Sequence, residues 1–457
     1  MIGSIRGSRD ARQRFSRSSQ GRRDRKPARG GFTLAELLVT LVVFSIILTA
    51  VMAMFVVNSR LARSQMHLTG MQQSQRAAQY ALVRSVRMAG RGGLPTSQYP
   101  VLPAYAGQLL PDGLAIGVDN NVAAGTEAGT CTGADSNCAN VLEGTDVLTV
   151  RGVFNSPVYQ LNPAAGDFSY DSSDGTGSLR IRHKSPTGVP QDLTPFEDLL
   201  GLNGDPLVDE ALVLVSPLDD EIYAIVELDS GGSAVTQVGG VTEIVNVAFT
   251  TSGTHGSSYL DLSPGGSYPV ALTTVAYVGI LEEYRFYVRE AYAIAGDTSS
   301  EVMPRLSRAR VFPGTDDAHA GDDANLNEDF VDNILDLQVA LGVDTTDGLG
   351  NRDGVVLEGD GVDTTPTADD EWLFNHTGDD PTEIKWANNV AAPSKLFYLR
   401  INTLARTDRP DTRFQAPLLT LIEDKDYTSA PFDDYNTRDE RIYRRRVLQT
   451  IVDLRNL

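Results

Sequence analysis

Cysteine and histidine, two residue types common in catalytic and metal sites, are scarce in this chain of 457 residues. It has two cysteines and five histidines: His67, His183, His255, His319 and His376. The histidines form no H-E-x-x-H pair, and the chain has neither a G-x-S-x-G motif nor a glycine-lysine phosphate loop. The common zinc-hydrolase, serine-hydrolase and nucleotide-binding motifs are therefore excluded. We expect no cofactor and no enzymatic activity. Acids are abundant, however, and a catalytic carboxylate pair assembled by the fold would have no sequence motif.

Charge, proline and glycine are missing from one long stretch near the amino terminus. The run from Leu37 to Val57 contains none of the three. At about 1.5 Å per helical residue it spans roughly 30 Å, the thickness of one bilayer core. A secretory signal peptide would have a shorter apolar region and a small-residue cleavage site. We therefore predict a membrane-spanning half of a helix over residues 32–57.

Proline is absent from a longer segment, between Pro27 and Pro95. A continuous helix of close to sixty residues, about 87 Å long, is thus permitted, with Gly70 as the candidate position for a bend. Apolar residues at seven-residue spacing predict an amphipathic half over residues 58–90 that packs on a sheet. These residues are Leu61, Leu68, Leu82 and Ala89, and beside them Val57, Met71 and Ala78. Gly90, Gly92, Gly93 and Pro95 supply the stop signal.

One acid, Glu36, lies at the start of the apolar run. A carboxylate in lipid costs a few kcal/mol unless it reaches the surface or finds a partner, and such an acid is a functional candidate by default. An ordinary anchor helix would not explain it.

The segment before the run, residues 1–31, is strongly basic. It holds ten Lys and Arg against two Asp. By the positive-inside rule it stays in the cytoplasm and leaves the other end of the helix outside. The alternative is a nucleic-acid-binding arm. Without this segment 29 basic and 58 acidic residues remain, a net charge of −29. Because an acidic exterior repels phosphates, we expect no nucleic-acid partner.

Residues 91–457 are rich in short strand-like runs separated by Gly, Asp, Ser and Pro. Helix first and strands after is an α+β order. We also predict a short second helix over Asn327–Leu335. The expected strands are Asp146–Val153, Ser178–His183, Ala211–Val215, Glu221–Leu228, Glu243–Phe249, Tyr277–Arg289, Ala309–Phe312, Leu337–Val343, Leu396–Leu404 and Arg445–Leu454.

The sequence Gly31-Phe32-Thr33-Leu34-Ala35-Glu36 resembles the cleavage site of type IV prepilins. The resemblance implies that a prepilin peptidase cuts between Gly31 and Phe32, that residues 1–31 are a leader, and that the new amino terminus at Phe32 is methylated. The leader is long for this family, so a start site downstream of Met1 is an alternative.

The same resemblance implies a role for Glu36 in subunit assembly. In this family the glutamate faces the free amine of a neighbouring subunit, here Phe32 of another copy. Two charges that are costly to leave bare in lipid would neutralise each other and set the axial step of a filament. The field of the helix amino terminus also favours an acid at this position.

Four short segments further along the chain are similar to the PilW-type minor pilins. They are Arg87-Met88-Ala89-Gly90, residues 144–151 (GTDVLTVR), residues 331–339 (VDNILDLQV) and the closing Arg445-Arg446-Val447 with Leu454-Arg455-Asn456. The resemblance implies a type IV pilin-like fold, in which a long amino-terminal helix packs on an antiparallel sheet domain. Gly113–Ala139, Asp229–Ser267 and Asp344–Pro381 would be insertions, the second holding a strand of its own.

Cys131 and Cys138 lie close together in a loop rich in Gly, Ala and Ser. An exported domain would sit where disulfides persist, and a bridge between them would restrict the unfolded chain. The alternative is two reduced thiols, and a zinc site is poor because no histidine lies near.

Two acidic stretches, one from Asp316 to Asp323 and one from Asp344 to Asp360, invite a calcium interpretation. Neither matches the EF-hand spacing, so we take them as solvated loops and predict no metal site.

Together these features predict a non-enzymatic minor pilin. Its expected partners are prepilin peptidase, other minor pilins, the major pilin, the inner-membrane assembly platform and the lipid bilayer. It would first span the inner membrane once, with its carboxyl-terminal domain in the periplasm, and later lie in the pilus at the cell surface. The alternatives are a minor pseudopilin of a type II secretion system and a signal-anchored periplasmic enzyme or binding protein.

Overall fold

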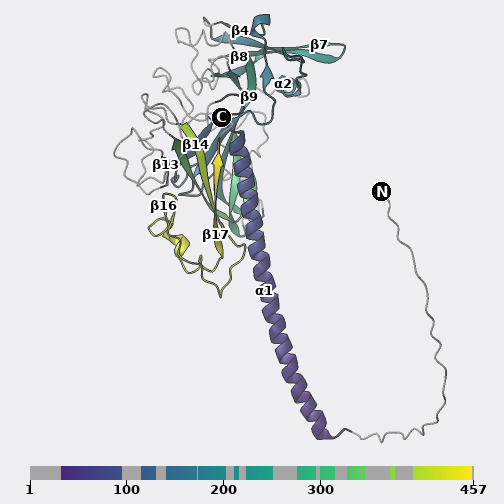
Figure 1. Ribbon diagram of the computed structural model, residues 1–457, viewed down its shortest axis with the longest axis vertical. Helices are drawn as coiled ribbons and strands as arrows, with labels where there is room; N and C mark the ends of the chain where they lie inside the picture. The colour runs from purple at the N-terminus through teal and green to yellow at the C-terminus, as the bar shows by residue number, and fades with distance from the viewer. Residues whose placement is uncertain are drawn as a thin grey trace, which may run out of the picture. The chain divides into compact units, whose positions relative to one another are not determined.

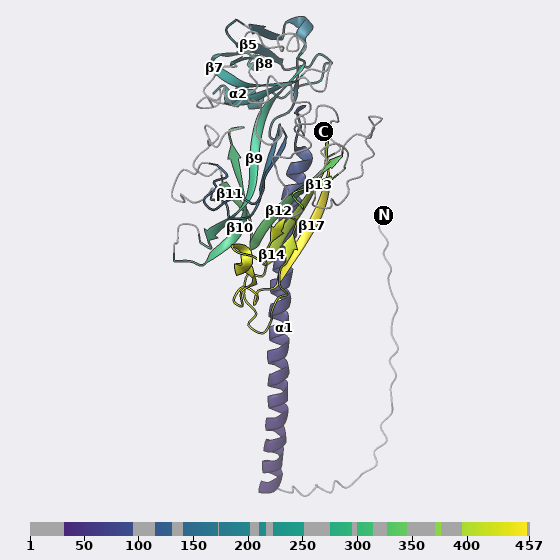
Figure 2. The same cartoon turned by 90° about the vertical axis from the view of Figure 1, so that its left-hand side faces the viewer.

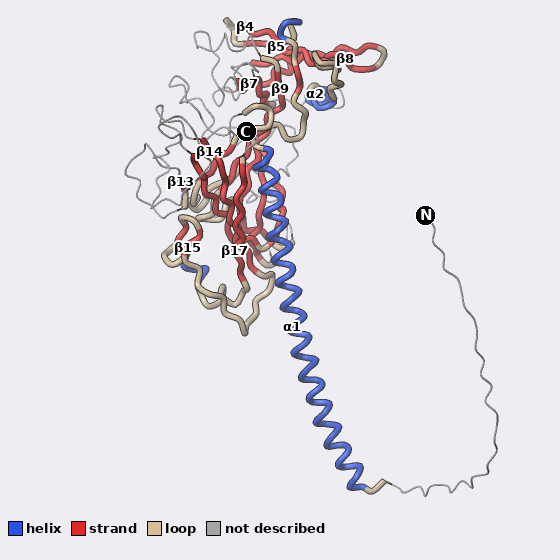
Figure 3. Tube along the Cα trace, in the orientation of Figure 1, coloured by secondary structure: helices blue, strands red, loops and turns tan. Residues whose placement is uncertain are grey.

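The computed structural model describes residues 32–94, 115–129, 140–171, 173–201, 210–215, 223–250, 275–294, 299–313, 327–344, 371–375 and 395–454. The chain divides into two compact units between Arg63 and Ser64. The described part of the first unit is helical, whereas strands dominate the second (Figure 3).

Helix α1 (Leu34–Met88) runs unbroken for 55 residues and passes through Gly70 without interruption (Figure 1). The predicted continuous helix is thereby confirmed. It ends at the expected glycines, where Gly90 has a φ of 71° and its N–H donates to the carbonyl of Arg151. At Gly93 the φ is 94°, and a Cβ would lie 2.7 Å from Val215, so only glycine fits.

The first prediction concerns the stability of the variant Gly70→Ala. No atom lies within 4 Å of where an added Cβ would be, and the residue is inside a helix. Alanine should therefore raise the free energy of unfolding by about 0.5–1 kcal/mol, because it loses less backbone entropy than glycine. Urea denaturation of the full chain in detergent, followed by circular dichroism, measures this change. A loss of stability would contradict the helical environment described.

The larger sheet has eleven strands, and every pairing in it is antiparallel. The order along the main path is β1-β2-β9-β6-β7-β8-β5-β4, with β3 and β10 also on β9 and β11 on β10. The strands are β1 (Ile116–Asp119), β2 (Val147–Gly152), β3 (Tyr159–Gln160), β4 (Phe168–Asp171), β5 (Thr176–Arg182), β6 (Ala211–Val215), β7 (Tyr223–Val238), β8 (Val241–Thr250), β9 (Tyr277–Tyr292), β10 (Val302–Val311) and β11 (Asn327–Asp332).

The second sheet has the order β13-β12-β14-β17 and is also antiparallel. Figure 2 shows β12, β14 and β17 side by side along the second half of α1. Its strands are β12 (Ile334–Asp344), β13 (Glu371–Leu373), β14 (Lys395–Arg406) and β17 (Arg445–Asp453). Smaller elements are helix α2 (Thr194–Leu199), the hairpin β15 (Leu421–Ile422) with β16 (Lys425–Asp426), and the 3₁₀ turns Pro163–Ala165 and Phe432–Asn436.

A long helix followed by antiparallel strands is an α+β architecture, as predicted. All ten predicted strands overlap an observed one, and the strand expected within Asp229–Ser267 is present as the outer part of β7 with β8. The other two segments predicted to be insertions also contain strands: β13 lies in Asp344–Pro381 and β1 in Gly113–Ala139.

The predicted helix over Asn327–Leu335 is wrong. This segment forms β11 and the start of β12, separated by Asn333 with a φ of 64°. Ion pairs hold β11 against its neighbours: the carboxylate of Asp329 lies 2.9 Å from Arg289 and 2.8 Å from Arg305. A nine-residue helix is marginal on its own, so these contacts between distant segments decide the conformation.

The stripe predicted for the second half of α1 is buried in part. Met71, Ala78, Leu82 and Ala89 are buried in the main hydrophobic core, and Leu68 packs against it. Val57 and Leu61, the two members nearest the apolar half, are exposed, whereas Val86, which was not predicted, is buried. This core also contains apolar residues of both sheets, so the helix is the common support of the globular unit.

Two glutamines on the same helix face are buried as well, which the apolar pattern does not indicate. Gln75 donates through Nε2 to the carbonyl of Thr403 at 3.0 Å and to that of Arg446 at 2.9 Å. Gln79 donates to the carbonyl of Leu448 at 3.0 Å. One turn apart, the two amides bind β14 and β17 to the helix.

Asp146, just before β2, joins the two sheets. Its carboxylate accepts from the N–H of Val339 on β12 at 2.6 Å and from that of Asn121 at 2.8 Å, and its own N–H donates to the carbonyl of Leu337 at 2.9 Å. Complete burial, reinforced by the nearby charge of Asp424, raises the pKa of Asp146 well above its usual range.

The raised pKa predicts how stability depends on pH. The folded state holds the Asp146 proton at pH values where the unfolded chain has lost it. Stability from this group is therefore greatest at low pH and decreases as pH rises above about 3.9, until the folded pKa is passed. In Asp146→Asn, the slope of unfolding free energy against pH should change by up to about 1.4 kcal/mol per unit within that window. Urea titrations between pH 4 and 7 measure it, and identical slopes in both proteins would contradict the assignment.

Candidate functional site

The first residues of α1 form a closed hydrogen-bonded arrangement around Glu36. The carboxylate oxygen Oε2 of Glu36 accepts from the backbone N–H of Thr33 at 3.0 Å and from its hydroxyl at 3.1 Å. In return the N–H of Glu36 donates to the Thr33 hydroxyl at 3.3 Å. This reciprocal pair is a capping box, in which Thr33 is the N-cap and Glu36 the third helical residue.

The capping box is not among the contacts predicted from the sequence, where Glu36 is interpreted as an isolated acid. Its signal in the sequence is the T-x-x-E spacing of Thr33 and Glu36. Only Oε2 of Glu36 is engaged; within the described residues, Oε1 accepts no hydrogen bond. Phe32, directly before the cap, is 84% exposed, and Gly31 lies outside the described residues.

Hydroxyl groups in the apolar part of the helix are satisfied by the helix itself. The four side chains donate to carbonyls three or four residues earlier: Thr40 to Glu36, Ser45 to Val42, Thr49 to Ser45 and Ser59 to Val56. A polar group that meets its own backbone does not need water, so this segment is compatible with lipid. By length and composition α1 is able to cross a membrane, and its apolar window is unburied in the single chain.

In the second unit, the described parts of the four segments that carry the downstream resemblance meet one another or the helix, while Arg455 and Asn456 lie outside the described residues. Gly90 at the end of α1 donates to the carbonyl of Arg151 at 2.9 Å. Gln338 donates to the carbonyl of Gly144 at 2.9 Å, beside the contacts of Asp146 with β12. The carbonyl of Arg446 accepts from α1 through Gln75. Segments far apart in sequence thus form one connected frame.

The other residues predicted from the sequence to form sites receive little structural support. Cys131 and Cys138 lie outside the described residues, as do the first acidic stretch and all of the second after Asp344. Among the residues that the structure does describe, no group of three or more His, Cys, Asp or Glu side chains is arranged to hold a metal ion. His67 places Nδ1 2.6 Å from a carboxylate oxygen of Asp408.

Comparison with known proteins identifies the amino-terminal motif. Residues 26–52 match the family model of the prokaryotic N-terminal methylation motif. No curated protein and no solved structure matches the chain. The match covers the predicted cleavage position, the capping box and the first part of the apolar helix, and it supports a pilin-like protein anchored in a membrane by α1.

Proposed function

We propose that this protein is a minor pilin of the PilW type, which joins other minor pilins to prime assembly of a type IV pilus. The observation that carries the proposal is the arrangement at the start of α1. The methylation motif spans the start of a helix apolar enough to cross a bilayer. Phe32 is exposed just before this helix, and Glu36, the fifth residue when Phe32 is counted as the first, lies in its first turn. The narrower proposal, the PilW type, is based on the similarity of the four short downstream segments to that family.

The proposed mechanism begins with prepilin peptidase, which removes residues 1–31 and methylates Phe32. The basic leader keeps this end in the cytoplasm, and the globular unit lies in the periplasm. The free amine of one subunit then meets the carboxylate of Glu36 in another, using the oxygen that the cap leaves open. The apolar helices pack side by side into a heterologous, open-ended assembly on the inner-membrane platform, together with the major pilin.

A filament end is the proposed location, because the globular unit from Ser64 onward is bulky for a repeating shaft. If this is right, the protein is much less abundant than the major pilin along isolated filaments. Equal abundance of the two would contradict it.

The deciding experiment is amino-terminal sequencing with intact mass determination of the protein from native membranes. We expect a chain that begins at methylated Phe32. Retention of Arg29 to Gly31 in the mature, active protein would contradict the proposal and favour a signal-anchored periplasmic protein. A chain processed at Phe32 that co-purifies with a secretion complex instead of pili would identify a minor pseudopilin.

A further inference from the structure

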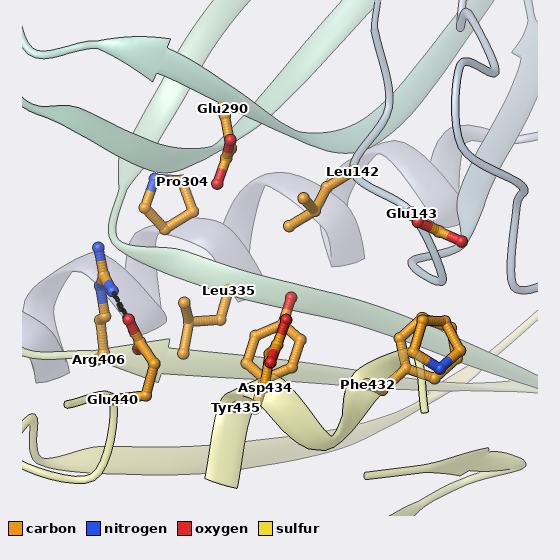
Figure 4. A pocket seen from close by; sticks show the side chains of 11 residues that line it. Leu142, Glu143, Glu290, Pro304, Leu335, Arg406, Phe432, Asp434, Tyr435 and Glu440 are labelled. Atoms are coloured by element: carbon orange, nitrogen blue, oxygen red, sulfur yellow. Dashed lines mark hydrogen bonds and ion pairs between the residues drawn. The ribbon is translucent and has the colours of Figure 1, made fainter. Parts of the chain in front are cut away.

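A small pocket opens between the ends of the two sheets and the segment after β16. Its volume is about 280 Å³. The carboxylates of Glu143, Glu290, Asp434 and Glu440 line it, together with the rings of Phe432 and Tyr435. Figure 4 shows Glu290 on the side of the pocket opposite to Asp434 and Tyr435.

Among the described residues that line the pocket, four carboxylates stand against one basic side chain, Arg406, which is already paired with Glu440 at 3.2 Å. The buried guanidinium of Arg445 is not part of the lining but interacts with Glu440 and Tyr435. The side chains of Glu143, Glu290 and Asp434 are exposed and make no ion pair within the described residues. Burial, reinforced by the carboxylates of Asp336, Glu290 and Glu440, raises the pKa of the Tyr435 phenol, as expected for a ring in a negative field.

The same two rings already hold a cation on the protein's own chain. The Nζ atom of buried Lys425 lies 4.7 Å from the ring centre of Phe432 and 5.5 Å from that of Tyr435. A carboxylate completes this internal site, because Asp336 lies 3.3 Å from Nζ. The fold therefore uses aromatic faces plus a carboxylate to bind an ammonium group, and the pocket offers further carboxylates beside the same two residues.

Pocket size and composition restrict the class of ligand. The volume lies just below the range of about 300–1,000 Å³ that is usual for drug-sized ligands, so one side chain fits better than a large molecule. Aromatic walls favour an organic cation, and none of the described acids is grouped for a metal ion. Exposed carboxylates at the mouth would attract a cation carried on another protein surface.

We propose that this pocket binds the ammonium or guanidinium end of a lysine or arginine side chain from a partner protein. The cation would enter between Glu290 and Asp434 and rest against Tyr435. This inference does not depend on processing at Phe32 or on filament assembly, and it adds a contact surface in the globular unit to the contacts made by the helix.

The test uses the full-length protein in detergent and saturation-transfer NMR with small probes. Nα-acetyl-lysine methylamide and its arginine counterpart represent the side chains, the norleucine counterpart is the uncharged control, and putrescine represents a free polyamine. At least one of the two basic probes should bind at millimolar concentration, and its binding should weaken when NaCl is raised from about 50 to 500 mM. The norleucine probe should not bind.

The variant Glu290→Gln/Asp434→Asn should weaken binding of the basic probe at least about fivefold, because two carboxylates are lost. The control variant Glu243→Gln also removes a carboxylate charge, but from an exposed position on β8 outside the pocket, and it should leave binding unchanged. Equal binding of norleucine, at least tenfold tighter binding of putrescine, no binding of either basic probe, or no effect of the double variant would overturn the proposal. If the double variant does not fold, the salt dependence and the norleucine comparison on the unmodified protein decide.

Discussion

Replacing Glu36 by glutamine should abolish assembly while leaving the helix start and the globular unit intact. Glutamine at the third helical position can still close a capping box with Thr33, so Glu36→Gln removes the charge and keeps the cap. A neighbouring amine in lipid would then lack its counter-charge. Breaking a buried pair in this way costs about 3–5 kcal/mol, which corresponds to at least about a hundredfold loss of assembled protein.

The matched control is Thr33→Ala, which removes the capping hydroxyl, leaves the backbone N–H of residue 33 able to donate to Glu36, and keeps the charge. It should cost about 1 kcal/mol of helix stability and leave assembly largely unchanged. Immunoblots of sheared filaments against whole cells measure assembly, and amino-terminal sequencing verifies that both variants are processed at Phe32. Normal assembly of Glu36→Gln together with failure of Thr33→Ala would show that the carboxylate serves only as a cap.

Local features of this fold can be predicted from the sequence. The absence of proline between Pro27 and Pro95 and the glycines from Gly90 onward determine the extent of α1, and alternating or β-branched runs locate ten strands. The cap of Thr33 on Glu36 is also local, since its two residues are three apart. Each of these depends on neighbours in the chain, which periodicity and motif spacing can detect.

Contacts between residues far apart in the sequence were not predicted. The segment Asn327–Leu335 has no strong local preference, and ion pairs from β9 and β10 make it a strand. Gln75 and Gln79 look like solvent-facing residues, yet their amides meet carbonyls more than 300 positions away. The pocket likewise combines Glu143 and Glu290 with residues beyond 400, so no single stretch of sequence reveals it.

The internal lysine site is the strongest example of a long-range contact and gives the second large prediction. Lys425 is buried, with Nζ 3.3 Å from a carboxylate oxygen of Asp336, to which the Tyr427 hydroxyl also donates. Burial raises the pKa of Asp336, and Lys425 opposes this rise. Asp336→Asn can still accept from Tyr427 but leaves a buried ammonium without a counter-charge. We expect a loss of about 3–5 kcal/mol in unfolding free energy, a large share of the 5–15 kcal/mol typical of a domain.

A double variant separates the charge from the packing. In Asp336→Asn/Lys425→Met the unpaired charge is gone, and most of the lost stability should return, because a well-packed apolar replacement for a buried pair is often neutral. Urea denaturation in detergent of the unmodified protein, the two single variants Asp336→Asn and Lys425→Met, and the double variant gives the coupling energy. A loss below about 1 kcal/mol in Asp336→Asn would mean that water reaches the ammonium. Because Lys425 also contacts the rings of Phe432 and Tyr435, Asp336→Asn should weaken binding of the basic probe to the neighbouring pocket, and the double variant should restore it in part.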